Sequence, residues 1–129
     1  MRVLSLFSFY GRASRSTWWL THLLSVAVMF VVLLLISIAF SGKLPSDGRL
    51  ATSDEIGNGG VIAFVVAGFF YVWANLCVNA KRWHDRDKSG WWQLISLIPL
   101  IGIWALIENG FLRDTAGSNR FGPNPLAKG

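Results

Sequence analysis

Three long stretches of the chain contain no Asp, Glu, Lys or Arg. They cover residues 16–42, 56–80 and 89–107 and are 27, 25 and 19 residues long. A helix needs about 20 apolar residues to cross the hydrocarbon core of a bilayer, and a lone segment in lipid satisfies its backbone groups only as a helix. The pattern predicts an all-α membrane protein, a bundle of three apolar segments in a single multi-pass domain over residues 1–129. The expected boundaries are spans at about 17–41, 60–80 and 90–108, a polar connector at 43–59 and a polar tail at 109–129.

The third segment is the shortest and contains Pro99 and Gly102. Its preferred interpretation is a kinked helix that still crosses the membrane, because neighbouring helices can satisfy the carbonyl that a proline leaves unpaired. The alternative is a re-entrant hairpin that turns between these two residues. Three crossings would place seven Lys and Arg inside and five outside, whereas a hairpin would place ten inside and two outside. The positive-inside rule favours the hairpin and the segment length favours the crossing; both place the N-terminus in the cytoplasm.

The second segment has two different faces when it is wound at about 100° per residue. One face is bulky and apolar and is expected to contact lipid. The opposite face carries small and amide side chains, which let helices approach closely and form hydrogen bonds between them. These candidate packing residues are Ala63, Ala67, Ala74, Asn75 and Asn79. A polar pathway lined by the two asparagines is the alternative.

The charge of the chain bears on its partners. Twelve Lys and Arg against seven Asp and Glu give a net charge of +5 and a pI of about 10. Because the basic residues flank the apolar stretches, the expected partners are the lipid bilayer and its anionic headgroups, not nucleic acid. The single Cys77 excludes an intrachain disulfide.

The polar segments between the stretches hold the candidate functional residues. His84 lies beside a carboxylate, but no nucleophile motif accompanies it, and the spacing does not match a usual zinc site. We therefore predict no catalytic, cofactor or metal site, and Asp85 and Asp87 are expected to face the N-terminal end of the next helix. The candidate polar cluster comprises Arg12, Arg15, Arg82, His84, Asp85, Ser89, Asn119 and Arg120.

Several motifs of the chain resemble a known family, the small bacterial inner-membrane proteins of domain-of-unknown-function family 805. The similar blocks are FYGRASR at 9–15 followed by WW at 18–19, RWHD at 82–85, SGWW at 89–92, and GSNRFGPNP at 117–125. Asp114 departs from the glycine expected at that position, and the connector is long for the family. The resemblance implies a multi-pass inner-membrane protein without an established activity.

Two functional hypotheses follow. The first is a non-enzymatic membrane protein whose polar loops and tail form an interaction surface or contact lipid headgroups. The second is a subunit of a small oligomeric channel or transporter, which would need other copies of the chain because three spans do not readily enclose a pore. A homo-oligomer or another membrane protein is the corresponding partner.

Overall fold

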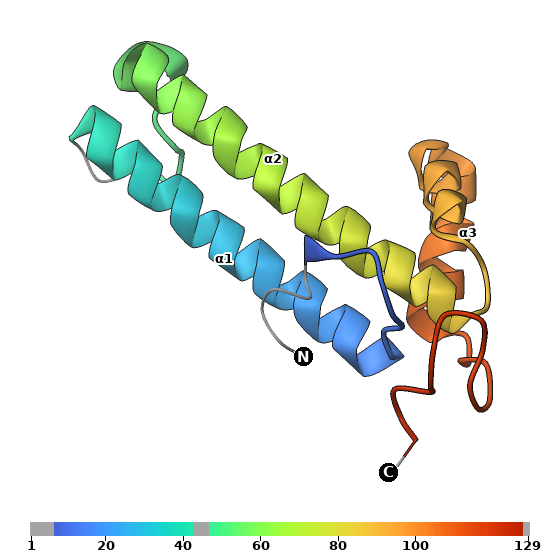
Figure 1. Cartoon of the computed structure of the whole chain (residues 1–129). Helices are drawn as coiled ribbons and strands as arrows, with labels where there is room; N and C mark the ends of the chain where they lie inside the picture. The colour runs from blue at the N-terminus through green and yellow to red at the C-terminus, as the bar shows by residue number, and fades with distance from the viewer. Residues whose placement is uncertain (1–6, 43–46, 128–129) are drawn as a thin grey trace. The chain divides into compact units, whose positions relative to one another are not determined.

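The computed structural model describes residues 7–42 and 47–127 of the chain (Figure 1). Its elements are α1 (Arg15–Ser41), α2 (Ser53–Asp85), the 3₁₀ helix η2 (Gly90–Leu97) and α3 (Pro99–Phe111). They divide into two compact units. Met1–His22 and Trp73–Gly129 form the first, called the clasp unit below, and Leu23–Val72 forms the second, called the connector unit.

Polar side chains mark where the two long helices begin. The hydroxyl of Ser14 accepts a hydrogen bond from the backbone N–H of Thr17 at 3.3 Å and so caps α1. At the start of α2 the Glu55 carboxylate accepts the Thr52 N–H at 2.7 Å, which is the glutamate half of a capping box. The expected loop at 43–59 is therefore wrong over its second half. Residues from Ser53 onward belong to α2, with a break at Gly57, where φ is 65°.

The apolar surface of α1 and α2 is largely uncovered. Both helices are long and apolar enough to cross a membrane, and only 6% and 11% of their most apolar 18-residue windows are buried. On α2, the predicted lipid face is open, with Val65, Phe69 and Val72 more than half exposed. Large apolar patches of this kind are unusual on a soluble protein. They fit helices whose surroundings are lipid.

The third apolar segment is a hairpin of two short helices, so the preferred prediction of one kinked helix is wrong. Ile98 is extended (φ −90°, ψ 117°) and Pro99 begins α3, because a proline disfavours the helical conformation of the residue before it. The 13 residues of α3 extend about 20 Å, less than the roughly 30 Å of a hydrocarbon core. Gly102 allows α3 to pack on η2, since a Cβ there would lie 2.8 Å from the carbonyl oxygen of Ser96.

Both ends of this hairpin return to the same part of the clasp unit. At its start, Gly90 lies against Ala80 of α2, where a Cβ on the glycine would be 3.1 Å away. At its end, Gly110 lies against the ring of Trp19 in α1, where the corresponding distance is 3.0 Å. The described chain therefore has two long apolar helices and a hairpin in place of the expected bundle of three spans.

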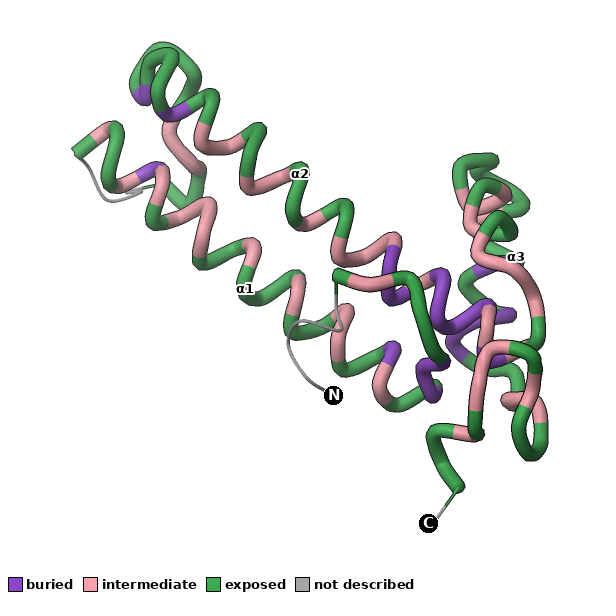
Figure 2. Tube along the Cα trace, viewed as in Figure 1, coloured by how far each residue is buried: buried purple, intermediate pink, exposed green. Residues whose placement is uncertain are grey.

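Burial is concentrated in the clasp unit (Figure 2). Buried residues gather in the C-terminal part of α2, in the segment that precedes α1 and near the end of α3. The connector unit has a smaller core, in which Ile56 is buried and the Ser37 hydroxyl accepts the N–H of Ala51 at 2.9 Å. Most of the buried polar and charged side chains therefore lie in the clasp unit.

Candidate functional site

A buried carboxylate, Asp85, lies between two arginines near the end of α2. Its Oδ1 accepts a hydrogen bond from Nε of Arg12 at 2.7 Å, and its Oδ2 accepts one from Nη1 of Arg82 at 2.5 Å. The same Nη1 of Arg82 also contacts Oδ1 of Asp114 at 2.5 Å. We call these four residues the clasp. Their side chains are at most 8% exposed, and their two positive and two negative charges compensate one another.

The other N–H donors of Arg12 and Arg82 bind backbone carbonyls at the ends of several segments. Arg12 donates to the backbone carbonyls of Thr115 at 2.9 Å and Gly117 at 2.7 Å, both in the tail. Arg82 donates to the carbonyls of Asn109 at 2.5 Å and Leu112 at 2.8 Å, at the end of α3. An arginine presents five donors in a rigid plane, so it can bind a carboxylate and several carbonyls at once. The clasp thus joins the N-terminal segment, α2, α3 and the tail.

Backbone and ring contacts extend this arrangement into the tail. The carbonyl of Asp85 accepts the N–H and the hydroxyl of Thr115 at 3.1 and 2.9 Å. Asn119 donates to the carbonyl of His84 at 2.8 Å, and the imidazole of His84 stacks on Phe121 with centroids 3.9 Å apart. The other partner of this imidazole is the carbonyl of Gly11, 3.1 Å from Nδ1, which assigns the proton to Nδ1.

Burial shifts the acidity of two groups here. It lowers the pKa of His84, and the nearby positive charges of Arg120 and Lys81 act in the same direction, against the hydrogen bond to Gly11. It raises the pKa of Asp85, and the hydrogen bond from Arg12 offsets part of that rise. Desolvation disfavours the charged form of each group, so the neutral imidazole is the form that fits this packing.

A second polar cluster lies beside the clasp. Glu108 of α3 accepts hydrogen bonds from Arg86 at 2.6 Å and from Lys88 at 2.8 Å. The ammonium of Lys88 also lies 5.0–5.4 Å from the centroids of three indole rings, close enough for cation–π attraction. These rings belong to Trp83, Trp92 and Trp104.

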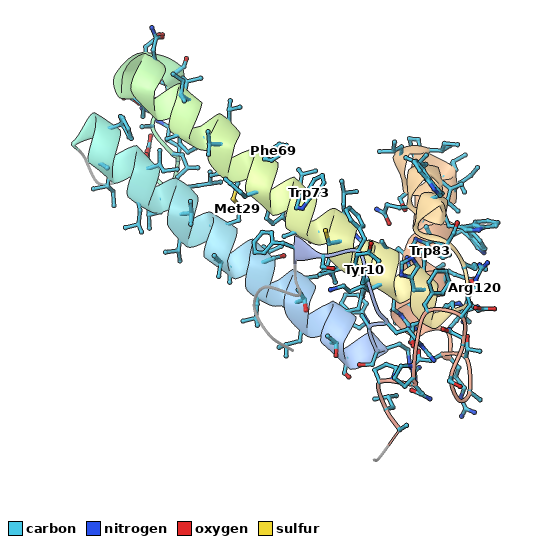
Figure 3. All side chains as sticks on the ribbon, viewed as in Figure 1. Tyr10, Met29, Phe69, Trp73, Trp83 and Arg120 are labelled. Carbon is cyan, nitrogen blue, oxygen red and sulfur yellow. The ribbon has the colours of Figure 1, made fainter. Side chains whose placement is uncertain are left out.

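The structure brings most of the predicted polar cluster together. Arg12, Arg82, His84, Asp85 and Asn119 converge in the contacts above. The other three members lie outside these contacts. Arg15 is exposed and donates to the carbonyl of Phe111 at 3.1 Å, Arg120 forms an exposed ion pair with Asp87 at 3.3 Å, and Ser89 precedes η2 without a side-chain capping bond. Figure 3 labels Trp83 on α2 and Arg120 in the tail.

The predicted packing residues lie on both units. Ala63 and Ala67 are half-buried in the connector unit, and Ala74 and Asn75 are half-buried in the clasp unit. The Asn79 side chain accepts the indole N–H of Trp18 at 2.7 Å and so links α2 to α1. This bond is the interhelical role that small and amide residues favour in lipid.

Sequence reasoning missed two carboxylates and misplaced a third. Asp114 was noticed only as a departure from the family pattern, yet it contacts Arg82. Glu108, the charge that ends the third apolar stretch, is not among the candidate residues either, yet it is 4% exposed and bound to two cations. Asp85 and Asp87 were expected to face the N-terminal end of the next helix; in the structure the oxygens of Asp85 are bound by Arg12 and Arg82, and Asp87 pairs with Arg120. A lone carboxylate beside an apolar stretch indicates a buried ion pair. Glu108 has this position in the sequence, so its pairing was predictable.

Fold and site together define a class of protein, a small helical membrane protein whose apolar hairpin is closed by a buried network of charges. The chain belongs to the family described as "Protein of unknown function (DUF805)", whose model matches residues 6–123. It is 34% identical to inner membrane protein YhaH of Escherichia coli (strain K12), over 91% of this chain and 86% of that protein. It is 30% identical to inner membrane protein YhaI of the same strain, over 91% of this chain and 85% of that protein. No solved structure matches the chain.

Proposed function

We propose that this chain is a non-enzymatic inner-membrane protein in which α1 and α2 cross the bilayer and the hairpin of η2 and α3 re-enters it from the cytoplasmic side. Two relatives are named as inner membrane proteins, and α1 and α2 have the length and hydropathy of spans. The sequence of the clasp unit contains ten of the twelve Lys and Arg. An excess of this size marks the cytoplasmic side of a membrane protein.

The function that the geometry supports best is contact with anionic lipid headgroups at this face. The observation that carries it is the division of the arginines. Arg12 and Arg82 are buried and neutralised within the clasp, so they do not serve as headgroup contacts. Arg15 and Arg113 are exposed, and neither forms an ion pair with the described part of the chain. The excess positive charge of the clasp unit is therefore presented on its surface.

The topology can be tested by labelling single cysteines in cells. Cys77→Ser provides the background, and Ser118→Cys in the tail and Ser53→Cys at the start of α2 provide two exposed positions. We expect a membrane-impermeant maleimide to label position 53 in spheroplasts and position 118 only after lysis. Labelling of position 118 in intact spheroplasts would contradict the re-entrant hairpin.

The lipid contact can be tested in nanodiscs of defined composition. The Arg15→Gln/Arg113→Gln protein removes the two exposed charges, and Arg49→Gln, an exposed arginine of the connector, is the matched control. A basic residue near an anionic surface contributes about 1 kcal/mol, so the double variant should lose roughly 30-fold in its preference for anionic over zwitterionic lipid. Arg49→Gln should keep that preference. If the double variant also keeps it, the headgroup proposal fails.

The channel or transporter alternative has less support. It depended on Asn75 and Asn79 lining a polar pathway, and the oxygen of Asn79 is instead bound to the indole of Trp18.

A further inference from the structure

A pocket with several polar residues in its wall lies between the hairpin and the beginning of α1. It encloses about 200 Å³ and lies entirely within the clasp unit. All three helices and η2 contribute to its wall. Its polar and aromatic lining comprises Trp18, His22, Asn79, Gln93, Ser96 and Asn109. Leu106 on the same wall is 48% exposed, so the pocket borders the outer surface of the hairpin.

Two residues of this lining each carry a buried side-chain oxygen that has no hydrogen-bond partner in the described part of the chain. The two atoms are Oε1 of Gln93 and Oδ1 of Asn109. Asn109 is only 3% exposed, so bulk water does not readily satisfy it. An unpaired buried acceptor is costly, and two of them on one small pocket, from different helices, indicate that a donor belongs there.

The lining restricts the chemistry of that donor. No Asp, Glu, Lys or Arg lines the pocket, so an ammonium or a phosphate group inside it would be a buried charge without a partner. Both unpaired oxygens belong to amides, which present an acceptor and a donor side by side. A hydroxyl group can donate to the amide oxygen and accept from the amide nitrogen, and it suits either orientation of the amide. Two unpaired oxygens call for two such hydroxyls.

The depth of the pocket favours an occupant that comes from the membrane. Trp18 and His22 lie three and seven residues into α1, which begins at Arg15. At 1.5 Å per residue they are about 5 and 10 Å along the helix axis. If α1 crosses the bilayer, this is the depth at which headgroups meet the hydrocarbon core.

We propose that this pocket binds a vicinal diol, presented by the terminal glycerol of phosphatidylglycerol, with its hydroxyls on Gln93 and Asn109. The volume is sufficient, because water occupies about 30 Å³ per molecule and a glycerol group needs only the space of a few waters. The inference rests on the proposed headgroup function and adds to it a choice among anionic lipids. Phosphatidic acid, which is also anionic but has no glycerol headgroup, should bind less well.

The test is native mass spectrometry of the full-length protein from nanodiscs that contain phosphatidylethanolamine with phosphatidylglycerol or phosphatidic acid. Two additional hydrogen bonds of about 1 kcal/mol each predict roughly 30-fold better retention of phosphatidylglycerol. Gln93→Leu and Asn109→Leu should each reduce this ratio several-fold. Arg15→Gln/Arg113→Gln should lower retention of both anionic lipids and leave their ratio unchanged, so failure of the headgroup function and failure of the pocket are distinguishable.

A soluble polyol presents the same hydroxyl groups as the lipid, so a separate experiment tests it. Free glycerol is titrated against the protein in nanodiscs of phosphatidylethanolamine alone, with thermal stability as the readout and the two leucine variants as controls for general osmolyte effects. A stabilisation by glycerol that both variants lose, without a lipid preference, would keep the site and assign it to a free polyol. Equal retention of the two lipids with no such stabilisation would overturn the proposal. A lipid preference that survives both substitutions would also overturn it. If Asn109→Leu does not fold, Gln93→Leu alone provides the same comparison.

Discussion

Replacing Asp85 with asparagine removes the negative charge that two buried arginines share. The substitution keeps the size of the side chain and leaves Arg12 with backbone carbonyls and an amide. Removing one partner of a buried ion pair costs about 3–5 kcal/mol. The lower figure applies here, because Arg82 keeps Asp114. We therefore expect the tail to detach about 3 kcal/mol more easily, a factor of roughly 150 in the open population.

Hydrogen exchange measures this opening directly. The amide of Thr115 donates to the carbonyl of Asp85 at 3.1 Å, so its protection reports tail docking, and amides in the middle of α2 serve as the internal reference. Three Asp→Asn variants give a graded series, since the exposed fractions of the side chains at 85, 114 and 87 are 0%, 8% and 49%. Exchange should accelerate about 150-fold for Asp85→Asn and less for Asp114→Asn, and stay within about twofold for Asp87→Asn, whose exposed pair contributes little. Exchange in Asp85→Asn within fivefold of the unsubstituted protein would refute the clasp as the element that holds the tail.

Three other substitutions or conditions test the packing around the clasp. Gly110→Ala should destabilise the hairpin by about 1–3 kcal/mol in thermal denaturation, because its Cβ would lie 3.0 Å from the ring of Trp19; Gly68→Ala, with open space around it, should be neutral or stabilising. Burial lowers the pKa of His84, so the imidazole binds a proton more readily in the unfolded chain than in the folded chain. Protection of the tail amides should therefore be full above about pH 6.5 and fall as the pH drops from there to the pKa of the folded protein. A His84→Phe protein should lack this dependence. Lys88→Met should destabilise the protein by about 1–2 kcal/mol in the same thermal assay, since the residue loses its bond to a buried carboxylate and its indole contacts; an unchanged melting temperature would show that the cation is dispensable.

Much of the architecture could be predicted from the pattern of charges. The two long helices follow from stretches that exclude charge, because any charge placed there would face lipid. The kinked helix was preferred to the hairpin because the third apolar segment is long enough to cross the membrane. The count of Lys and Arg on each side already favoured the hairpin. Pro99 decides the outcome by forcing Ile98 into an extended conformation. The start of α2 was misplaced for a local reason, since the capping contact between Thr52 and Glu55 lies in a region with the composition of a loop.

Three of the four clasp residues were predicted as functional candidates, but Asp114 and the role of the clasp were not. The basic motifs at 9–15 and 81–88 suggested lipid contacts, because flanking arginines usually remain at the surface. What the sequence does not reveal is that Asp85 and Asp114 meet the arginines of two motifs that are about 70 residues apart in the chain. A pairing between distant segments depends on the return of the hairpin, which itself was left open. The buried charges and the hairpin were therefore uncertain for the same reason.

The hairpin and the clasp depend on each other structurally. A hairpin whose turn lies in lipid must have its unpaired backbone groups covered by protein, and its ends must be held together if it is to return to the side on which it entered. Arg82 binds the carbonyls of Asn109 and Leu112 where α3 ends, and Glu108 binds Lys88 just before η2 begins. These contacts connect the exit of the hairpin to its entrance. It follows that substitutions in the clasp should loosen the pocket between the hairpin and α1, and that loss of the preference for phosphatidylglycerol should accompany tail opening in Asp85→Asn but not in Asp87→Asn.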